Sequence, residues 1–344
     1  MACQNAAASA KRFLGILVVM LLSDGAVTRL VAASAANPAA CVAADAALAF
    51  VKASPVVVGA QQKDKWLAMF AENGLIQDPF GAIHQQGRQQ QSDFWDTFIS
   101  GINITFAPHY DIVTCTSVVR IVNISAITPN GCPTNMRTII VYDLIPPPAE
   151  AHAKLPSAAK LQLASLTALW SLQERSAQLF RHTCAWKATA QMSIRMLKFL
   201  GPTGAGRYAS GFFSIGKEGQ SAAAAALADL AGEDGVRAFS RHFSESGSLT
   251  LHQPGSARTF VSPTAIVAGL GDWGCKLVAP PNSTVPTARR VSAEVGFACG
   301  SSKHAPGLAV IDFAADSLSL VAAAFYVGTP TGPVLSPKRE QAVI

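Results

Sequence analysis

Hydrophobic residues change their spacing around residue 70, and this change predicts the order of the central elements. Trp66 is followed by Met69 and Phe70 at helical spacing, so one face of a first helix is apolar. Asn73-Gly74 is expected to end that helix, because glycine readily takes the left-handed conformation of a helix end. A short strand is predicted over residues 75–78, since the proline that follows has no amide hydrogen for a sheet. The pattern therefore predicts a helix, a turn and a strand that ends on the carboxylate of Asp78.

The flanking patterns complete a first folded unit. β-branched residues dominate residues 102–128, which predicts strands, and Thr128-Pro129-Asn130-Gly131 predicts a turn between strands. A curved antiparallel sheet wrapped by helices accounts for the whole order. The other predicted elements are a helix over 43–53 that ends at Ser54-Pro55, a helix near 94–99, and strands over 137–145 and 161–172.

A helix is also predicted over residues 184–200. Trp186, Ala190, Ile194 and Leu197 form one apolar stripe along it, and the glycine-rich residues 201–206 have the composition of a linker.

The pattern of the first unit then returns in the second half of the chain. Phe243-Ser-Glu-Ser-Gly247 corresponds to Phe70-Ala-Glu-Asn-Gly74, and Val310-Ile-Asp312 corresponds to Val141-Tyr-Asp143. We interpret the second half as a degenerate tandem copy of one fold. Its predicted elements are helices over 222–230, 235–243 and 263–270, and strands over 248–251, 290–299, 308–313 and 318–327.

Residues 64–99 carry the most specific motifs. The helix ends in Phe70-Ala-Glu-Asn-Gly74, the strand ends in Asp78-Pro79-Phe80-Gly81, and the next helix opens near Phe94-Trp95. This run resembles the cone-shaped fold shared by nuclear transport factor two, ketosteroid isomerase and the SnoaL-like polyketide cyclases. The resemblance covers residues 43–180 well and 220–328 weakly. It implies an α+β protein with two cone-shaped domains, each a curved antiparallel sheet wrapped by about three helices.

The resemblance and the composition together divide the chain. We expect a signal peptide at residues 1–35 and a ketosteroid isomerase-like domain at 41–184. A helix and linker at 185–206 would lead to a second, degenerate copy at 207–329, and residues 330–344 have the composition of a disordered tail.

Asp78 matches the catalytic base of the isomerase branch. In that mechanism an aspartate takes a proton next to a carbonyl group, and hydroxyl or acid donors stabilise the oxygen that gains charge. The alternative is that Asp78 only caps a turn before proline. His84, in the loop that follows, matches the proton partner of the dehydratase branches, or it is an exposed loop histidine.

Three positions bear on the donors that would stabilise this oxygen. Phe50 stands near the tyrosine of the isomerases and has no hydroxyl. Aligning Tyr142 with its family counterpart turns Asp143 to the outer face of the sheet and leaves Ile140 at the pocket position, because a shift by one residue changes the face. Tyr142 then becomes either a pocket hydroxyl or a core tyrosine. The epoxide-hydrolase branch is disfavoured, since its arginine and aspartate lie two residues apart and Arg137 is six from Asp143.

Aromatic residues are expected to surround an apolar pocket in the first domain or to form its core. In the second domain Leu251 or His252 replaces the base and Leu227 replaces the tyrosine, so we expect no such chemistry there. The predicted pocket residues are Phe50, Trp66, Phe70, Phe80, Trp95, Phe98, Ile140 and Trp170.

The N-terminus predicts export. Lys11-Arg12 precedes the apolar residues 13–22 and a small-residue stretch, which is the layout of a secretory signal. The alternative is a membrane anchor within residues 13–35. No later stretch is apolar and long enough to span a membrane.

The charge disfavours nucleic acid as a partner. The net charge of +6 falls to +4 without residues 1–35, which hold three basic residues and one acidic residue, and no Arg/Lys cluster remains.

Six cysteines remain after the predicted signal, and an even number in an exported chain favours disulfides over a metal site. We expect Cys115–Cys132, Cys275–Cys299 and Cys41–Cys184, each within a domain, although fifteen complete pairings exist. Asn103, Asn123 and Asn282 lie in glycosylation triplets.

Two functional hypotheses follow. In the first, a secreted or lumenal protein binds a small hydrophobic molecule and isomerises or dehydrates it through Asp78, without metal or other cofactor. In the second, the fold is a non-catalytic ligand-binding or protein-interaction module. Under either, domain pairing or a homodimer is expected, and no membrane contact after signal cleavage.

Overall fold

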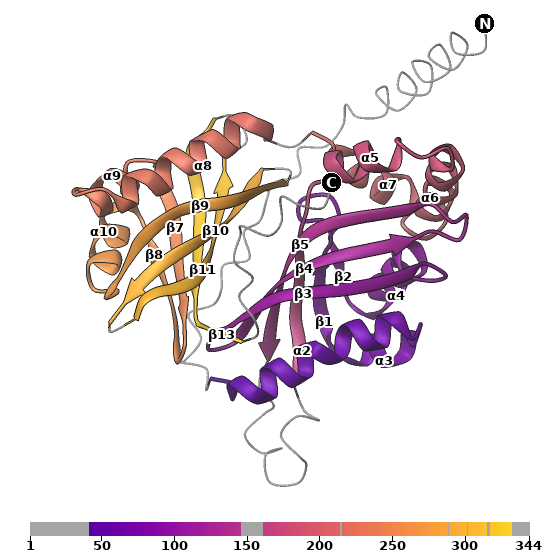
Figure 1. The fold of residues 1–344 in the computed structure, drawn as a ribbon, viewed down its shortest axis with the longest axis horizontal. Helices are drawn as coiled ribbons and strands as arrows, with labels where there is room; N and C mark the ends of the chain where they lie inside the picture. Colours follow the sequence, from indigo (N-terminus) through magenta and orange to yellow (C-terminus); the bar gives the residue numbers. More distant parts are fainter. Residues whose placement is uncertain are drawn as a thin grey trace, which may run out of the picture. The chain divides into compact units, whose positions relative to one another are not determined.

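The computed structural model describes residues 41–145, 161–213, 215–287, 289–300, 302–314 and 317–331 (Figure 1). The predicted signal peptide (1–35) and residues 332–344 of the predicted tail lie outside these ranges. The described residues form one compact unit. Two sheets and the helices packed on them make up its described part, so the fold is α+β with curved, mainly antiparallel sheets.

The first sheet has seven strands in the order β13-β3-β4-β5-β6-β1-β2. Helices α2, α3 and α4 lie along one side of it (Figure 1). All pairings are antiparallel except that of β1 with β6. The elements are α2 (Ala44–Gly59), α3 (Lys63–Ala68), β1 (Phe70–Gln77), β2 (Gln85–Gln86), α4 (Arg88–Phe98), β3 (Asn103–Val113), β4 (Ser117–Ile127), β5 (Pro133–Ile145) and β6 (Gln162–Leu169).

The second sheet has six strands in the order β8-β7-β12-β11-β10-β9, and β7 pairs in parallel with β12. Its elements are α8 (Gly216–Ala231), α9 (Gly235–Ser240), β7 (Phe243–Gln253), β8 (Ser256–Val261), α10 (Pro263–Gly271), β9 (Cys275–Thr287), β10 (Arg290–Cys299), β11 (Ser302–Phe313) and β12 (Leu320–Val327).

The two domains repeat each other in register as well as in element order. Phe70 pairs with Leu163 and, after a bulge, Leu75 pairs with Ser165. In the second domain Phe243 pairs with Leu320, followed by the same shift of register. The tandem interpretation made from these sequence motifs is therefore matched by equivalent positions in the two sheets.

The predicted helix around Phe70 is wrong at its end. The helix stops at Ala68, and Phe70 already belongs to β1. Gly74 marks the bulge and not a helix end, because a Cβ there would lie 3.0 Å from the carbonyl oxygens of Ala71 and Leu163. The close approach of two strands, and not a left-handed turn, requires this glycine.

Two other predicted ends are also wrong. The first helix continues through Pro55 to Gly59, because Val51, Ser54 and Val58 bury one continuous face. The predicted linker at 201–206 is helical. Three helices follow the first sheet, namely α5 (Leu172–Leu179), α6 (Ala185–Phe199) and α7 (Gly201–Ser210).

The end of the described chain returns to the first sheet. β13 (Thr329–Thr331) pairs with β3 in antiparallel orientation. Pro330 and Thr331, which the composition placed in a disordered tail, are therefore part of a strand that links the two halves of the chain.

Three disulfides join Cys41–Cys115, Cys132–Cys184 and Cys275–Cys299. Only the last of the three expected pairings is correct. The other two are exchanged because Cys115 follows β3 and lies beside the residues that precede α2, where the Val42 amide donates to the Cys115 carbonyl at 2.9 Å. Cys132 instead lies beside the start of α6, a neighbour that sequence distance does not reveal.

The outer faces of the two sheets pack against each other. Their apolar contact is made by Tyr110, Ile112, Val119, Ile121, Ile139, Val141 and Leu169 of the first domain with Val285, Leu308, Val310 and Tyr326 of the second. At its polar edge the Glu294 carboxylate accepts from the Tyr110 hydroxyl at 2.8 Å and from Arg137 Nη2 at 2.6 Å. The inner face of each sheet is thus left to its own helices.

Candidate functional site

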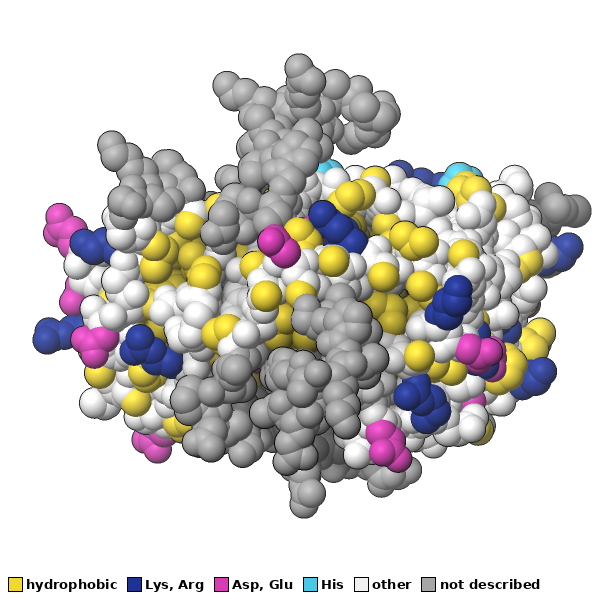
Figure 2. Space-filling model, turned by 90° about the horizontal axis from the view of Figure 1, so that it is seen from below, with side chains coloured by type: hydrophobic (Ala, Val, Ile, Leu, Met, Phe, Trp, Pro, Cys, Tyr) yellow, Lys and Arg dark blue, Asp and Glu magenta, His cyan; other side chains and the backbone are white. Residues whose placement is uncertain are grey.

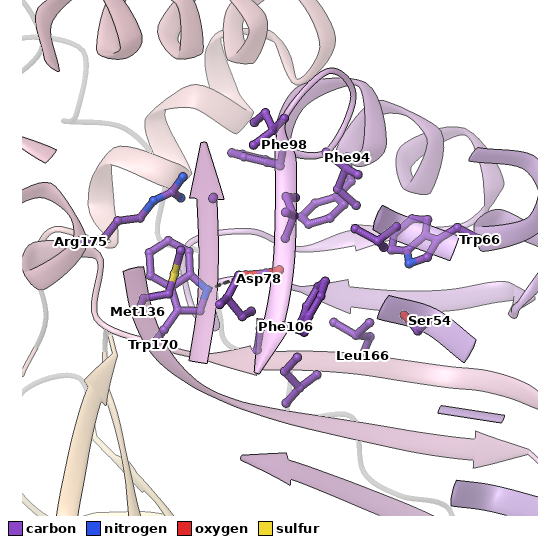
Figure 3. A pocket seen from close by; sticks show the side chains of 18 of the residues that line it. Ser54, Trp66, Asp78, Phe94, Phe98, Phe106, Met136, Leu166, Trp170 and Arg175 are labelled. Carbon is purple, nitrogen blue, oxygen red and sulfur yellow. Dashed lines mark hydrogen bonds between the residues drawn. The ribbon is translucent and has the colours of Figure 1, made fainter. Parts of the chain in front are cut away.

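A cavity of about 100 Å³ lies inside the first domain, between the inner face of the sheet and helices α2 to α5 (Figure 3). Its walls are largely apolar. They consist of Val58, Trp66, Phe94, Phe98, Ile99, Ile102, Ile104, Phe106, Ile124, Ala126, Met136, Ile140, Leu166, Ala168 and Trp170, with Ser54, Asp78, Tyr142 and Arg175 as the polar members.

Asp78 supplies the carboxylate of this cavity. It follows β1 directly, and its side chain turns toward Trp170, whose indole Nε1 donates to Asp78 Oδ1 at 2.6 Å (Figure 3). Burial raises the pKa of Asp78, while the indole hydrogen bond and the positive charge of Arg175 act in the opposite direction. The result is a carboxylate that is held in place and is easier to protonate than one in water.

Arg175 is the cation beside this carboxylate. The guanidinium carbon lies 5.2 Å from the centre of the Trp170 ring, a cation–π contact. Ser171 fixes the start of α5 by accepting the Glu174 amide at 3.1 Å, and this places Arg175 in the first turn of the helix. The indole therefore contacts Asp78 through its N–H edge and Arg175 through its ring face.

Tyr142 and Ser54 supply the hydroxyl groups. Tyr142 is fully buried, and burial raises its pKa, so the hydroxyl keeps its proton and remains a donor at neutral pH. A hydrogen bond with Ser54 and the charge of Arg120 oppose that rise in pKa, whereas the charges of Asp111 and Asp78 add to it. Asp78 and Tyr142 are thus close enough for one to affect the ionisation of the other.

Tyr208 of α7 is a further hydroxyl near this group. Its ring stacks on Phe98 with centroids 5.6 Å apart. Burial raises the pKa of Tyr208, Arg175 lowers it and Asp78 raises it. No sequence pattern indicates Tyr208, because its segment has the glycine content of a linker.

The residues that the sequence predicted as catalytic fall into two groups, inside and outside the cavity. Asp78 and Tyr142 share the cavity. Asp143 lies on the opposite face of the sheet, where it accepts from the hydroxyls of Ser117 at 2.7 Å and Ser165 at 2.6 Å. His84 is exposed and does not line the cavity.

The predicted pocket residues divide in the same way. Trp66, Phe98, Ile140 and Trp170 line the cavity. Phe50, Phe70 and Trp95 pack in the surrounding core, and Phe80 lies outside it, under the guanidinium of Arg290 at 3.4 Å.

Two polar residues of the cavity are absent from the sequence-based prediction. Ser54 precedes a proline, which is the pattern of a helix end and not of a pocket residue. Arg175 comes after the last predicted strand of the first domain, where no motif points to the cavity.

The second domain is packed differently at the position that corresponds to Asp78. By the shared strand register, Leu251 stands where Asp78 stands, and it is buried. Trp273, Phe297 and Phe325 pack together inside the sheet, and a hollow of only about 10 Å³ remains beside Trp273. Apolar rings thus occupy the space that the first domain leaves open.

Within the described ranges no cluster of three or more His, Cys, Asp or Glu side chains could hold a metal ion. Among the helices there, none is long and apolar enough to cross a membrane.

The comparisons with known proteins give a likeness of fold. No family model matches the sequence, and no curated protein matches it. Solved structures that resemble the chain include proteins with a ketosteroid isomerase-like fold, and those described below match about the length of one domain.

One such structure is a Mycobacterium tuberculosis protein in complex with estradiol-17beta-hemisuccinate. It is 19% identical with a TM-score of 0.31, and covers 37% of this chain and 95% of that one. The delta 5-3-ketosteroid isomerase of a Mycobacterium species is 19% identical with a TM-score of 0.30, covering 36% and 92%. A computationally designed 17-OHP binder is 18% identical with a TM-score of 0.31, covering 37% and 94%. At these identities and TM-scores the likeness does not extend to activity or ligand.

Proposed function

We propose that the first domain binds a small apolar carbonyl compound and that Asp78 moves a proton on the carbon next to the carbonyl group. The observation that carries this proposal is the raised pKa of Asp78 at the wall of an apolar cavity. A base is most effective when its pKa approaches the working pH, and burial shifts this carboxylate in that direction.

The proton transfer uses groups that the chain itself provides. Trp170 donates to Asp78 Oδ1, which leaves Oδ2 to take the proton from the α carbon. The electron pair of the broken C–H bond moves into an enolate, whose oxygen accepts a hydrogen bond from the protonated hydroxyl of Tyr142. Asp78 then returns the proton to another carbon of the same molecule, which completes an isomerisation.

The size of the cavity limits the ligand. About 100 Å³ has room for one small ring or for the end of a longer apolar molecule. The aromatic walls favour an unsaturated or ring-shaped ligand over a charged one.

Hydrogen–deuterium exchange tests the proposal on a panel of candidate substrates. Purified protein is incubated in D₂O with a series of small unsaturated ketones, and loss of the α proton signal is followed by NMR. For any ketone that the protein accelerates, Asp78→Asn is expected to reduce the exchange rate by about 100-fold or more. Asp64→Asn, at an exposed position on α3, is the control and keeps the wild-type rate. Equal rates in wild type and Asp78→Asn would show that Asp78 is not the base.

A binding protein without catalysis is the second candidate function. It is favoured by Phe50, which lies in the surrounding core and brings no hydroxyl to the cavity. Under this candidate, a ligand captured from a cell extract and identified by mass spectrometry binds equally well to wild type and to Asp78→Asn. The protein then accelerates α-proton exchange for none of the ketones.

We also propose that the chain is exported and glycosylated. Three disulfides support this, because such bonds persist in oxidising compartments. Asn103 is exposed and therefore accessible to the glycosylation machinery, whereas Asn123 is half-buried. Expression in secreting cells is expected to yield protein in the medium that lacks residues 1–35 and loses mass on glycosidase treatment.

A further inference from the structure

Helix α6 presents an apolar stripe to solvent that nothing in the described structure covers. Trp186 is 62% exposed, Ile194 66% and Leu197 55%. The ring of Phe180, 52% exposed, contacts Trp186 with centroids 5.7 Å apart and extends the stripe. The sequence pattern identifies this same stripe, which includes Ala190, as the apolar face of the helix.

The opposite side of α6 packs against the first domain, as the apolar face of an amphipathic helix does. Ala185, Ala188 and Met196 are buried, and Met192 packs on the core of the first domain. Arg195 is turned inward as well, since it donates to the backbone carbonyls of Asp96 and Ser100. The exposed stripe is therefore a second apolar face, and the fold of this domain does not need it.

Within the chain segment that carries the stripe, the charged residues are of one sign. No aspartate or glutamate occurs between residues 175 and 213. The cationic residues in that segment are Arg175, Arg181, Lys187, Arg195, Lys198 and Arg207, of which Arg181, Lys187, Lys198 and Arg207 are exposed. On the face shown in Figure 2, by contrast, acidic and basic side chains are interspersed.

The lysines lie along one edge of the stripe. At about 100° per residue, Trp186, Ala190, Ile194 and Leu197 fall within an arc of about 80°, and Lys187 and Lys198 follow directly beside it. A lysine at such an edge can rest its methylene groups on an apolar surface and keep its ammonium group in the polar layer. Tryptophan has a similar preference for the boundary between an apolar phase and water.

We infer that the α6 stripe docks onto the surface of a membrane that contains anionic lipid. The apolar side chains enter the boundary of the acyl chains, and the flanking cations meet the negative headgroups, which is how an amphipathic helix lies on a bilayer without crossing it. Charge complementarity favours an anionic membrane over a second copy of the chain, because a second copy would bring the same cations into contact with each other. The inference departs from the sequence-based expectation of no membrane contact and is independent of the chemistry of Asp78.

Tryptophan fluorescence can report on this contact specifically. The other four tryptophans are at most 8% exposed, so only Trp186 is open to a quencher in the bilayer. The full chain is mixed with brominated phosphatidylcholine vesicles, with or without about 30% phosphatidylserine. We expect quenching with the anionic vesicles, much weaker quenching with the neutral ones, and none for Trp186→Phe. Quenching at Trp186 also separates this contact from binding through residues 13–35, which are unchanged in every variant.

Charge variants complete the test. Lys187→Glu with Lys198→Glu is expected to lower the partition coefficient on anionic vesicles by about 30-fold. The matched control, Lys52→Glu with Lys217→Glu, changes the same net charge at exposed lysines of α2 and α8 and keeps the wild-type partitioning. The inference is overturned if Trp186 is not quenched, if both double variants lose binding equally, or if sedimentation shows a dimer that Leu197→Ser converts to monomer.

Discussion

At the scale of single residues, the cavity is organised around one indole. Trp170 donates to Asp78 and lies under Arg175, so a single side chain orients both charged groups of the site. The position of Asp78 was predictable, because its motif ends a strand in a recognisable fold. Arg175 and Tyr208 were not, since both come from helices after the last predicted strand and carry no local pattern that points to the cavity.

Asp78 is expected to reduce the stability of the protein at neutral pH. Its folded-state pKa is raised, so the folded state favours the protonated acid and the charged form costs stability. That cost in stability is absent below the pKa that Asp78 has in the unfolded chain. It grows as the pH rises from there through the higher pKa that Asp78 has in the folded protein. Asp78→Asn, whose amide oxygen still accepts from Trp170, should therefore unfold at a higher temperature than wild type at pH 7, by up to about 3 °C.

Thermal unfolding of the two proteins at pH 7 and near pH 3.5 measures this effect. The difference between them should shrink as the pH falls. A variant that is less stable than wild type at pH 7 would show instead that the carboxylate contributes to stability there.

At the scale of elements, α5 to α7 connect the site to the rest of the chain. α5 brings Arg175, α7 brings Tyr208, and the Cys132–Cys184 disulfide fastens the start of α6 to the first sheet. The sequence predicted α6 well, because its apolar spacing is long and regular. It did not predict α7, because glycines disfavour helices in isolation, and burial of Tyr208 outweighs that preference here.

Removal of this disulfide should affect ligand binding as well as stability. Cys132→Ser with Cys184→Ser is expected to cost about 2–4 kcal/mol of unfolding free energy. It should also weaken binding of the captured ligand, since α5 and Arg175 lie in the loop that the bond closes. Cys275→Ser with Cys299→Ser is the control: it destabilises the second domain, and binding is unchanged. Denaturant unfolding and ligand titration provide the two readings, and equal loss of binding in both double variants would rule out a specific role for this disulfide.

At the scale of the whole molecule, one fold occurs twice, and the first copy holds a cavity of about 100 Å³, whereas the hollow beside Trp273 in the second measures about 10 Å³. The repeated sequence motifs made the tandem arrangement predictable. The return of β13 to the first sheet was not, because a three-residue strand has no periodicity to detect. The disulfide partners were equally hidden, since they depend on which strand end meets which helix start.

The contact between the two sheets should make the domains unfold together. Glu294 accepts from both Tyr110 and Arg137 across that contact, and its loss leaves both donors without this carboxylate. Glu294→Ala is expected to cost about 1–3 kcal/mol. Calorimetry should show one transition for wild type and a broader or split transition for the variant. Glu245→Ala, an exposed position on β7, is the control. An unchanged single transition in Glu294→Ala would mean that this carboxylate does not couple the domains.

The most direct test is a titration of the Asp78 carboxyl group itself. Its carbon resonance is assigned by comparison with Asp78→Asn and followed by NMR against pH in the folded protein. We expect a pKa clearly above the ordinary aspartate value of about 3.9, and a further rise in Trp170→Phe, which removes the indole donor. A pKa at or below the ordinary value would contradict the proposed role, because Asp78 would then be a well-solvated or ion-paired surface acid with no special basicity.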